Sequence, residues 1–234
     1  MLTIENLVTG YGKIEILHGV NMQIKDHHMT VVIGPNGAGK STIFRAIFGI
    51  IKVWDGTISF NGTDISKLNT QELLKRGISY VPQGRNIFPL MTIEENLEMG
   101  AYIRNDKNQI KKDIEQIYKR FPILGERREE EARNLSGGQQ QMLEMGRSLL
   151  LDPEFIMLDE PSLGLAPNIA DKIFKEIIKI KESGKTIMMV EQNAKRALEL
   201  ADFAYVLELG KNKYEGPARD IMENEKVRKL YLGG

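Results

Sequence analysis

One eight-residue segment has the residue types and the spacing that bind phosphate. Residues 34–41 read Gly-Pro-Asn-Gly-Ala-Gly-Lys-Ser, which fits the pattern G-x-x-x-x-G-K-[ST], and they follow the apolar run Met29–Ile33. Glycines in such a loop aim successive N–H groups at phosphate oxygens, and a helix beginning near Gly39 turns the positive end of its dipole to the same anion. The sequence therefore predicts a nucleoside triphosphate site. Its expected ligand-binding residues are Gly34, Pro35, Asn36, Gly37, Ala38, Gly39, Lys40, Ser41 and Thr42.

Two side chains of this segment have specific expected roles. Lys40 should contact the β- and γ-phosphates, and the Ser41 hydroxyl should ligate Mg²⁺. The alternative, a glycine-rich turn that binds nothing, is disfavoured because an apolar run precedes the segment and a helical pattern follows it.

A second acidic element suits phosphoryl chemistry. The apolar run Phe155–Leu158 ends in Asp159 and Glu160. In such an element the first acid assists Mg²⁺ and the second polarises an attacking water. This element alone is weak evidence for phosphoryl chemistry, because buried strands that end in exposed acids are common in α/β proteins.

A third segment, Leu135-Ser136-Gly137-Gly138-Gln139, predicts another anion-binding helix start. Ser136 can cap the helix, and the paired glycines leave its backbone N–H groups uncovered.

Apolar patterning predicts the elements that position these motifs. Strands are expected at 2–4, 14–24, 29–33, 57–60, 78–81, 155–158 and 186–190, and helices at 43–48, 71–76, 136–151, 167–183 and 193–201. Asn61-Gly62 predicts a hairpin turn, and residues 205–209 and 212–215 predict a second hairpin followed by a short helix. Helices that alternate with buried strands predict an α/β fold with a largely parallel sheet.

Residues 84–134 have a helical texture and are expected to form an inserted subdomain. Thr92 begins a capping box, and an apolar face is expected from Ile110, Ile114, Ile117, Tyr118 and Phe121. The charged run 126–133 suits either a solvated loop or a patch that faces a partner. The predicted division is a core of residues 1–83 and 135–234, with a β-rich N-terminal part, and a helical subdomain of residues 84–134 that continues into the helix after Ser136.

Composition narrows the function classes. Lys plus Arg and Asp plus Glu both number 32 in 234 residues, so no net charge favours binding to nucleic acid. The absence of cysteine excludes disulfides, thiolate catalysis and cysteine-ligated metal sites. Neither a signal peptide nor an apolar window long enough to span a bilayer is evident, so we expect membrane association to run through a partner protein.

Taken in order, these motifs resemble those of ATP-binding cassette (ABC) ATPases over nearly the whole chain. The resemblance implies a P-loop NTPase cassette that binds ATP and Mg²⁺. It implies that Tyr11 stacks on adenine, that Gln83 and Asp159 join Ser41 at the metal, and that Glu160 is the catalytic base assisted by Lys40 and Gln192. The signature residues that it places against nucleotide are Ser136, Gly137, Gly138 and Gln139.

Two departures from the general ABC pattern are informative. Ala166 occupies the usual aspartate position after Glu160, and Gln192 occupies the usual histidine position, where it can donate a hydrogen bond but cannot carry a titrating charge. With Gly84–Pro89 and Glu160–Pro167, these features resemble the LivF-type ATPases of branched-chain amino acid importers.

The resemblance also implies partners. These are a second ABC ATPase, identical or related, that shares each ATP between Lys40 of one subunit and Ser136 of the other; transmembrane permease subunits; and, indirectly, an extracellular or periplasmic binding protein. The expected location is the cytoplasmic face of the membrane. Gln83, Ile87, Phe88 and Met91 suit either a permease socket or the core of the helical subdomain.

Other functions stay open at this point. The cassette also suits another transporter, including an exporter, or a soluble ABC ATPase that acts on nucleic acid or the ribosome. The last usually has tandem cassettes, long coiled coils or basic arms, none of which is evident here. A P-loop small-molecule kinase is disfavoured because it leaves residues 135–139 without a role.

Overall fold

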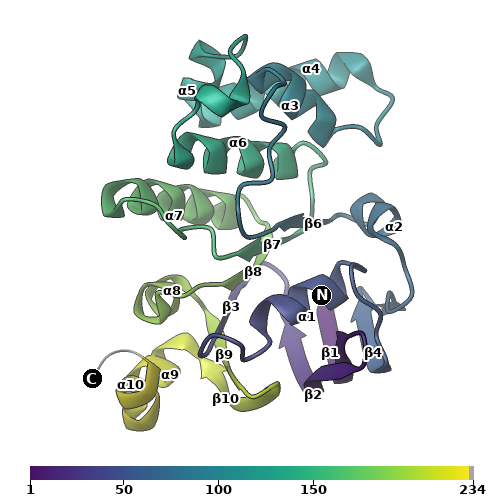
Figure 1. Ribbon diagram of the computed structural model, residues 1–234, viewed down its shortest axis with the longest axis vertical. Helices are drawn as coiled ribbons and strands as arrows, with labels where there is room; N and C mark the ends of the chain where they lie inside the picture. Colours follow the sequence, from purple (N-terminus) through teal and green to yellow (C-terminus); the bar gives the residue numbers. More distant parts are fainter. Residues whose placement is uncertain (232–234) are drawn as a thin grey trace.

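A six-stranded sheet carries the loop that is predicted to bind phosphate. In the computed structural model, which describes residues 1–231, its strand order is β10-β9-β3-β8-β7-β6 (Figure 1). The pairs from β9 to β6 are parallel and β10 lies antiparallel to β9, which confirms the largely parallel sheet. The strands are β3 (Met29–Ile33), β6 (Ile78–Val81), β7 (Phe155–Asp159), β8 (Thr186–Val190), β9 (Phe203–Glu208) and β10 (Lys211–Pro217).

A four-stranded antiparallel sheet lies beside it, with the order β2-β1-β4-β5. Its strands are β1 (Leu2–Tyr11), β2 (Ile14–Ile24), β4 (Asp55–Phe60) and β5 (Thr63–Asp64). Strand β1 runs seven residues beyond the predicted end at Ile4. The prediction stopped too early because register shifts between Ile4 and Leu7 and at Thr9 break the alternation of apolar and polar residues. Tyr11 is consequently the last residue of a strand.

Both predicted hairpins are confirmed. Asn61 and Gly62 have φ of 48° and 77° between β4 and β5, and Leu209 and Gly210 have φ of 48° and 72° between β9 and β10. Positive φ at both central residues matches the twist of antiparallel strands.

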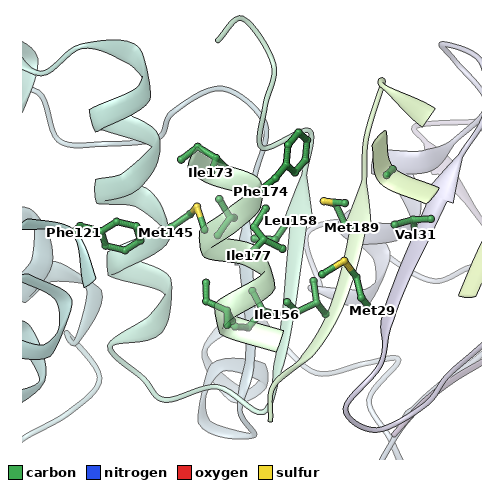
Figure 2. Packing of buried hydrophobic residues seen from close by; sticks show 14 of the residues in the cluster. Met29, Val31, Phe121, Met145, Ile156, Leu158, Ile173, Phe174, Ile177 and Met189 are labelled. Carbon is green, nitrogen blue, oxygen red and sulfur yellow. The ribbon is translucent and has the colours of Figure 1, made fainter. Parts of the chain in front are cut away.

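The two faces of the large sheet pack against different partners. Val31, Leu158 and Met189 belong to one apolar cluster, which contains Ile173, Phe174 and Ile177 of helix α7 (Pro167–Glu182) and is shown in Figure 2. Val32, Met157 and Met188 face a second cluster, formed with the small sheet and helix α1 (Lys40–Ile47). Successive side chains of a strand point to opposite faces, which explains this division. The other helices around the core are α2 (Thr70–Lys75), α8 (Ala194–Leu200), α9 (Ala218–Glu223) and α10 (Glu225–Tyr231).

Helices also follow β6. They are α3 (Ile93–Gly100), α4 (Lys107–Arg120), α5 (Pro122–Glu126) and α6 (Gly137–Leu149), with a 3₁₀ turn at Ala132–Asn134, and α6 lies between the other three and α7 (Figure 1). The predicted capping box is confirmed, since the Thr92 N–H donates to Glu95 Oε2 at 2.7 Å and the Glu95 N–H donates to Thr92 Oγ1 at 3.1 Å.

The predicted apolar face is also confirmed: Ile114, Ile117, Tyr118 and Phe121 are buried, and Ile110 packs against them. Among residues 1–231, none of the helices combines the length and the apolar character needed to cross a bilayer.

Candidate nucleotide-binding site

The loop predicted to bind phosphate connects β3 to α1 and requires its glycines. Gly34 has φ of 151°, and a Cβ there would lie 2.2 Å from the Leu207 carbonyl oxygen. Gly39 has φ of 100°, and a Cβ there would lie 2.6 Å from Leu17 Cδ2. A side chain at Gly34 would therefore collide with β9 of the large sheet, and one at Gly39 with β2 of the small sheet.

Lys40 is bent back over this loop. Its ammonium group donates to the carbonyl oxygens of Gly34 and Pro35 at 2.9 and 3.0 Å, and the residue is only 6% exposed. Burial lowers the pKa of Lys40, against the opposing influence of Glu160 and Asp159. The ammonium is thus held in an environment where a further anion would stabilise it.

Asp159 ends β7 beside the loop. Ser41 Oγ donates to its Oδ1 at 3.0 Å, and the Tyr80 hydroxyl donates to its Oδ2 at 3.0 Å. A carboxylate beside a hydroxyl is an oxygen donor set that fits Mg²⁺, which keeps several waters and takes few protein ligands. Within residues 1–231, no cluster of three or more His, Cys, Asp or Glu side chains could hold a metal ion, so a metal at this position would depend on mixed oxygen ligands.

The buried Asp159 leads to a stability prediction. Burial raises its pKa, so the folded state binds a proton more readily than the unfolded state, and stability falls as pH rises from the ordinary aspartate pKa through the folded-state pKa. We expect Asp159→Asn to melt at a higher temperature than the parent at pH 8 but not at pH 3, because the parent carboxyl is then neutral. Thermal unfolding without nucleotide, at both pH values, tests this. A variant that melts lower at pH 8 would contradict it.

Glu160 sits next to Asp159 on a strained backbone. Its φ is 49°, a conformation that costs a non-glycine residue of order 1–3 kcal/mol. Its N–H donates to the Val190 carbonyl oxygen at 2.8 Å, and Gln83 Nε2 donates to its Oε2 at 2.9 Å. Burial, followed by the charge of Asp159, raises the pKa of Glu160. A carboxylate with a raised pKa suits a general base near neutral pH.

Gln192 follows β8 and is exposed. Its N–H and that of Asn193 donate to Glu191 Oε1 at 2.9 and 3.3 Å, and Glu191 is 2% exposed. The buried Glu191 therefore sets the backbone direction at Gln192.

The segment 135–139 begins α6, with Ser136 as the N-cap. Gln139 Oε1 accepts from the Ser136 N–H at 2.9 Å and from Arg127 Nη1 at 3.1 Å. A Cβ at Gly138 would lie 2.2 Å from Ile169 Cγ2, so this glycine also permits α6 to pack on α7. Ser136 itself is exposed at the helix start.

Tyr11 lies beside the first turns of α1. Its hydroxyl is 3.4 Å from Thr42 Oγ1 and accepts from Arg45 Nη1 at 3.1 Å, and the residue is 39% exposed. Adenine stacking by Tyr11 stays a prediction.

The structure thus joins some predicted residues and separates others. Hydrogen bonds join Ser41 to Asp159 and Gln83 to Glu160, and the charges of Glu160 and Asp159 act on Lys40. Among the residues that the structure describes, no hydrogen bond connects residues 135–139 to the loop at 34–41.

Sequence reasoning missed three polar side chains at these positions. Tyr80 holds Asp159, Arg45 holds Tyr11, and Arg127 holds Gln139. Arg127 belongs to the charged run 126–133, so that run includes a support for the helix start as well as solvated residues. Only the pairing of β6 with β7 brings Tyr80 to Asp159, and no local pattern reveals it.

The fold and the site together define a class. Residues 17–163 match the family model described as ABC transporter, and the chain belongs to this family as a nucleotide-binding ATPase subunit. It is 42% identical to the high-affinity branched-chain amino acid transport ATP-binding protein BraG of Pseudomonas aeruginosa, and the match covers 100% of both chains. It is also 42% identical to the probable branched-chain amino acid transport ATP-binding protein LivF of Archaeoglobus fulgidus, over all of this chain and 99% of that one.

Solved structures agree with this class. A nucleotide-free ATP-binding cassette from an ABC transporter superposes with a TM-score of 0.88 at 29% identity, covering 100% of this chain and 99% of that one. A dimeric post-hydrolysis cassette, MJ0796 bound to ADP and Pi, superposes with a TM-score of 0.82 at 27% identity, covering 94% and 99%.

Proposed function

We propose that the chain is the ATP-hydrolysing subunit of an importer for branched-chain amino acids, held at the cytoplasmic face of the membrane by a permease. The motifs Gly84–Pro89 and Glu160–Pro167 support this, as does 42% identity over the whole chain to two proteins named for that transport. The transported substrate is the part that depends most on these relatives.

The site residues divide into three roles. Lys40 and the segment 34–42, through the backbone N–H groups of its residues other than Pro35, bind the β- and γ-phosphates, and Tyr11 binds adenine. Ser41, Asp159 and Gln83 would hold Mg²⁺, which when bound adds positive charge next to the phosphates. Glu160 and Gln192 face the γ-phosphate. The contact of Ser41 with Asp159 and that of Gln83 with Glu160 support this grouping.

The chemistry follows from Glu160. Its carboxylate accepts a proton from water, the water oxygen bonds to the γ-phosphorus, and the bond to the bridging oxygen breaks to give ADP and inorganic phosphate. Lys40 stabilises the charge on the phosphate oxygens during this step. The raised pKa of Glu160 strengthens it as a base.

One observation carries the proposal that two cassettes act together. The chain has two helix starts that the sequence predicts to bind anions, at α1 and at α6, with no hydrogen bond between their loops in the described residues. A head-to-tail pair would place the Ser136 end of one chain against the ATP on Lys40 of the other. The γ-phosphate then favours the closed pair, because it binds both faces only in that state.

We also propose a division of labour within the chain, with residues 1–83 and 135–234 as the core and 84–134 as a helical subdomain that meets the permease. A cavity of about 210 Å³ lies where the two parts meet, lined by Phe48, Tyr80, Met99, Tyr102 and Arg147 among others. Met99 and Tyr102 are 38% and 58% exposed.

The four residues predicted for the socket divide between the two interpretations. Ile87 packs against the apolar cluster that contains α7, as expected if it belongs to the core of the helical subdomain. Phe88 is 39% exposed, and the Arg147 guanidinium lies 4.9 Å from its ring centre. Met91 is partly buried and Gln83 is exposed beside Glu160. A socket formed by Phe88, Met99 and Tyr102 is therefore the version that we propose.

Tyr102→Glu should separate docking from catalysis. A charge at this exposed ring should prevent co-purification with the permease while basal ATPase stays near the parent value, because no hydrogen bond joins Tyr102 to the loop at 34–41 among the described residues. Leu230→Glu, at a 63% exposed position on α10, is the matched control and should co-purify normally. Normal co-purification of Tyr102→Glu would place the socket elsewhere.

Transport tests the proposed function as a whole. The chain should co-purify from membranes with its permease, and the reconstituted complex should take up leucine, isoleucine and valine at the expense of ATP. ATP-driven export, or ATPase that nucleic acid or ribosomes stimulate in place of a permease, would favour the alternative ABC functions.

A further inference from the structure

Arg85 lies between the segment 135–139 and the loop that precedes α7. It follows Gln83 by two residues and has φ of 56°, after Gly84 with φ of 104°. Left-handed backbone costs a non-glycine residue of order 1–3 kcal/mol and persists where the surroundings enforce it. This strained turn directs the side chain towards the start of α6.

The Arg85 guanidinium lies directly on the signature glycine. A Cβ built on Gly137 would lie 2.6 Å from Arg85 Cζ and 2.7 Å from both terminal nitrogens. Arg85 Nη2 also donates to the Gly164 carbonyl oxygen at 3.3 Å, in the loop after Glu160. One side chain thus touches both the segment 135–139 and the loop that precedes α7.

The next residue fixes Arg85 to α6. The Asn86 N–H donates to Glu144 Oε1 at 2.9 Å, and Arg147 Nη1 donates to the Asn86 carbonyl oxygen at 2.5 Å. Glu144 and Arg147 are on α6, so the backbone N–H and C=O of Asn86 are both held by the helix whose start lies beside Arg85. A charge held this way needs little reorganisation when a ligand arrives.

The charge of Arg85 has no internal partner in the part of the chain that the structure describes. No carboxylate there lies within ion-pair distance of its guanidinium, although Arg127 and Arg133 each pair with one and Arg104 pairs with two. An unneutralised guanidinium beside uncovered N–H groups suits a phosphate, which it binds through two parallel hydrogen bonds.

We propose that Arg85 is a catalytic residue that acts on the ATP of the second cassette, where its guanidinium joins the α6 start in binding the γ-phosphate and stabilises its charge during hydrolysis. This inference rests on the proposed head-to-tail pair. It gives the α6 side of the shared site a full positive charge in addition to the partial charge of a helix dipole. Arginines inserted in this manner in other phosphoryl-transfer enzymes raise kcat by about 10³ to 10⁵.

Removal of the charge should slow hydrolysis without loss of ATP binding. We expect Arg85→Met to lower kcat by about 10²-fold or more, since the helix dipole shares the task, and to leave the Kd of the monomer for ATP unchanged. Arg85→Lys keeps the charge but not the planar guanidinium, so its kcat should lie between that of the parent and that of Arg85→Met. Arg219→Met, at an exposed arginine paired with Glu223 on α9, controls for loss of a surface charge.

Mixing two impaired variants decides whether Arg85 acts on the ATP bound to its own chain or on the ATP bound to the neighbouring chain. A mixed pair of Arg85→Met and Lys40→Ala has one site with Lys40 from the first chain and Arg85 from the second. That site is intact if Arg85 acts on the neighbour's ATP, so ATPase activity should return on mixing. If Arg85 acts on its own chain's ATP, each site in every dimer lacks a required residue and the mixture stays inactive.

A parallel mixture separates this proposal from the proposed function. Ser136→Glu with Lys40→Ala should regain activity on mixing, since Ser136 serves the neighbour's site in the head-to-tail arrangement. Recovery here without recovery for Arg85→Met overturns the role of Arg85 alone. No recovery in either mixture overturns the shared site, and the role of Arg85 with it.

Discussion

Glu160→Gln should bind ATP with near-normal affinity and hydrolyse it about 10²- to 10⁴-fold more slowly, the range that a general base contributes. The amide carbonyl can still accept the hydrogen bond from Gln83, so the local structure should persist. Replacement also removes the charge repulsion with Asp159 that helps to raise the Glu160 pKa, so the fold should not weaken. Single-turnover hydrolysis and equilibrium ATP binding measure the two effects.

The same variant should accumulate as an ATP-bound dimer. With hydrolysis blocked, the γ-phosphate stays in place and holds the closed pair. Size exclusion with ATP should give the dimer mass, and with ADP the monomer mass. Glu129→Gln, at a glutamate whose side chain is 86% exposed, is the matched control and should turn over normally. Unchanged turnover in Glu160→Gln would show that another group activates the water.

Lys40→Ala should weaken nucleotide binding, which Glu160→Gln should leave near normal. A hydrogen bond to a charged group contributes about 1.5–3 kcal/mol, so loss of the ammonium should weaken ATP binding by about 10- to 100-fold. Among the described residues the buried ammonium donates to two carbonyl oxygens of its own loop, so its removal should leave the fold intact. Isothermal titration with ATP and ADP measures the change.

Lys175→Ala provides the control for that experiment, because Lys175 is exposed on α7 and away from the loop at 34–41. It should bind ATP as the parent does. Full ATP affinity in Lys40→Ala would mean that triphosphate binds somewhere other than this loop.

Features that depend on neighbouring residues could be predicted from the sequence. The loop at 34–41, the hairpin turn at Asn61-Gly62 and the capping box at Thr92 each follow from residue types at fixed short spacing, and the structure has the corresponding elements. The strand that ends in Asp159 was predicted for the same reason, since a continuous apolar run marks a strand buried on both faces.

Features that depend on strand order or on backbone strain could not be predicted from the sequence. Tyr80 reaches Asp159 only because β6 lies next to β7 in the sheet, although the two residues are 79 positions apart. The full length of β1 was missed because its bulges break the alternation of apolar and polar residues. The direction of the Arg85 side chain follows from a φ of 56°, which no residue pattern announces.

The central claim is that two chains enclose one ATP between the loop at 34–41 and the start of α6. The chain has no cysteine, so single cysteines introduced into it are the only thiols present. Asn36, in the loop at 34–41, and Ser136, at the start of α6, are both exposed. Chains carrying Asn36→Cys can therefore be mixed with chains carrying Ser136→Cys, all in the Glu160→Gln background, and treated with a short bismaleimide.

The product of that reaction tests the claim most directly. The account predicts a cross-linked dimer with ATP and little or none with ADP or without nucleotide. A mixture that binds ATP but yields no dimeric product, or yields the same amount without nucleotide, would contradict it.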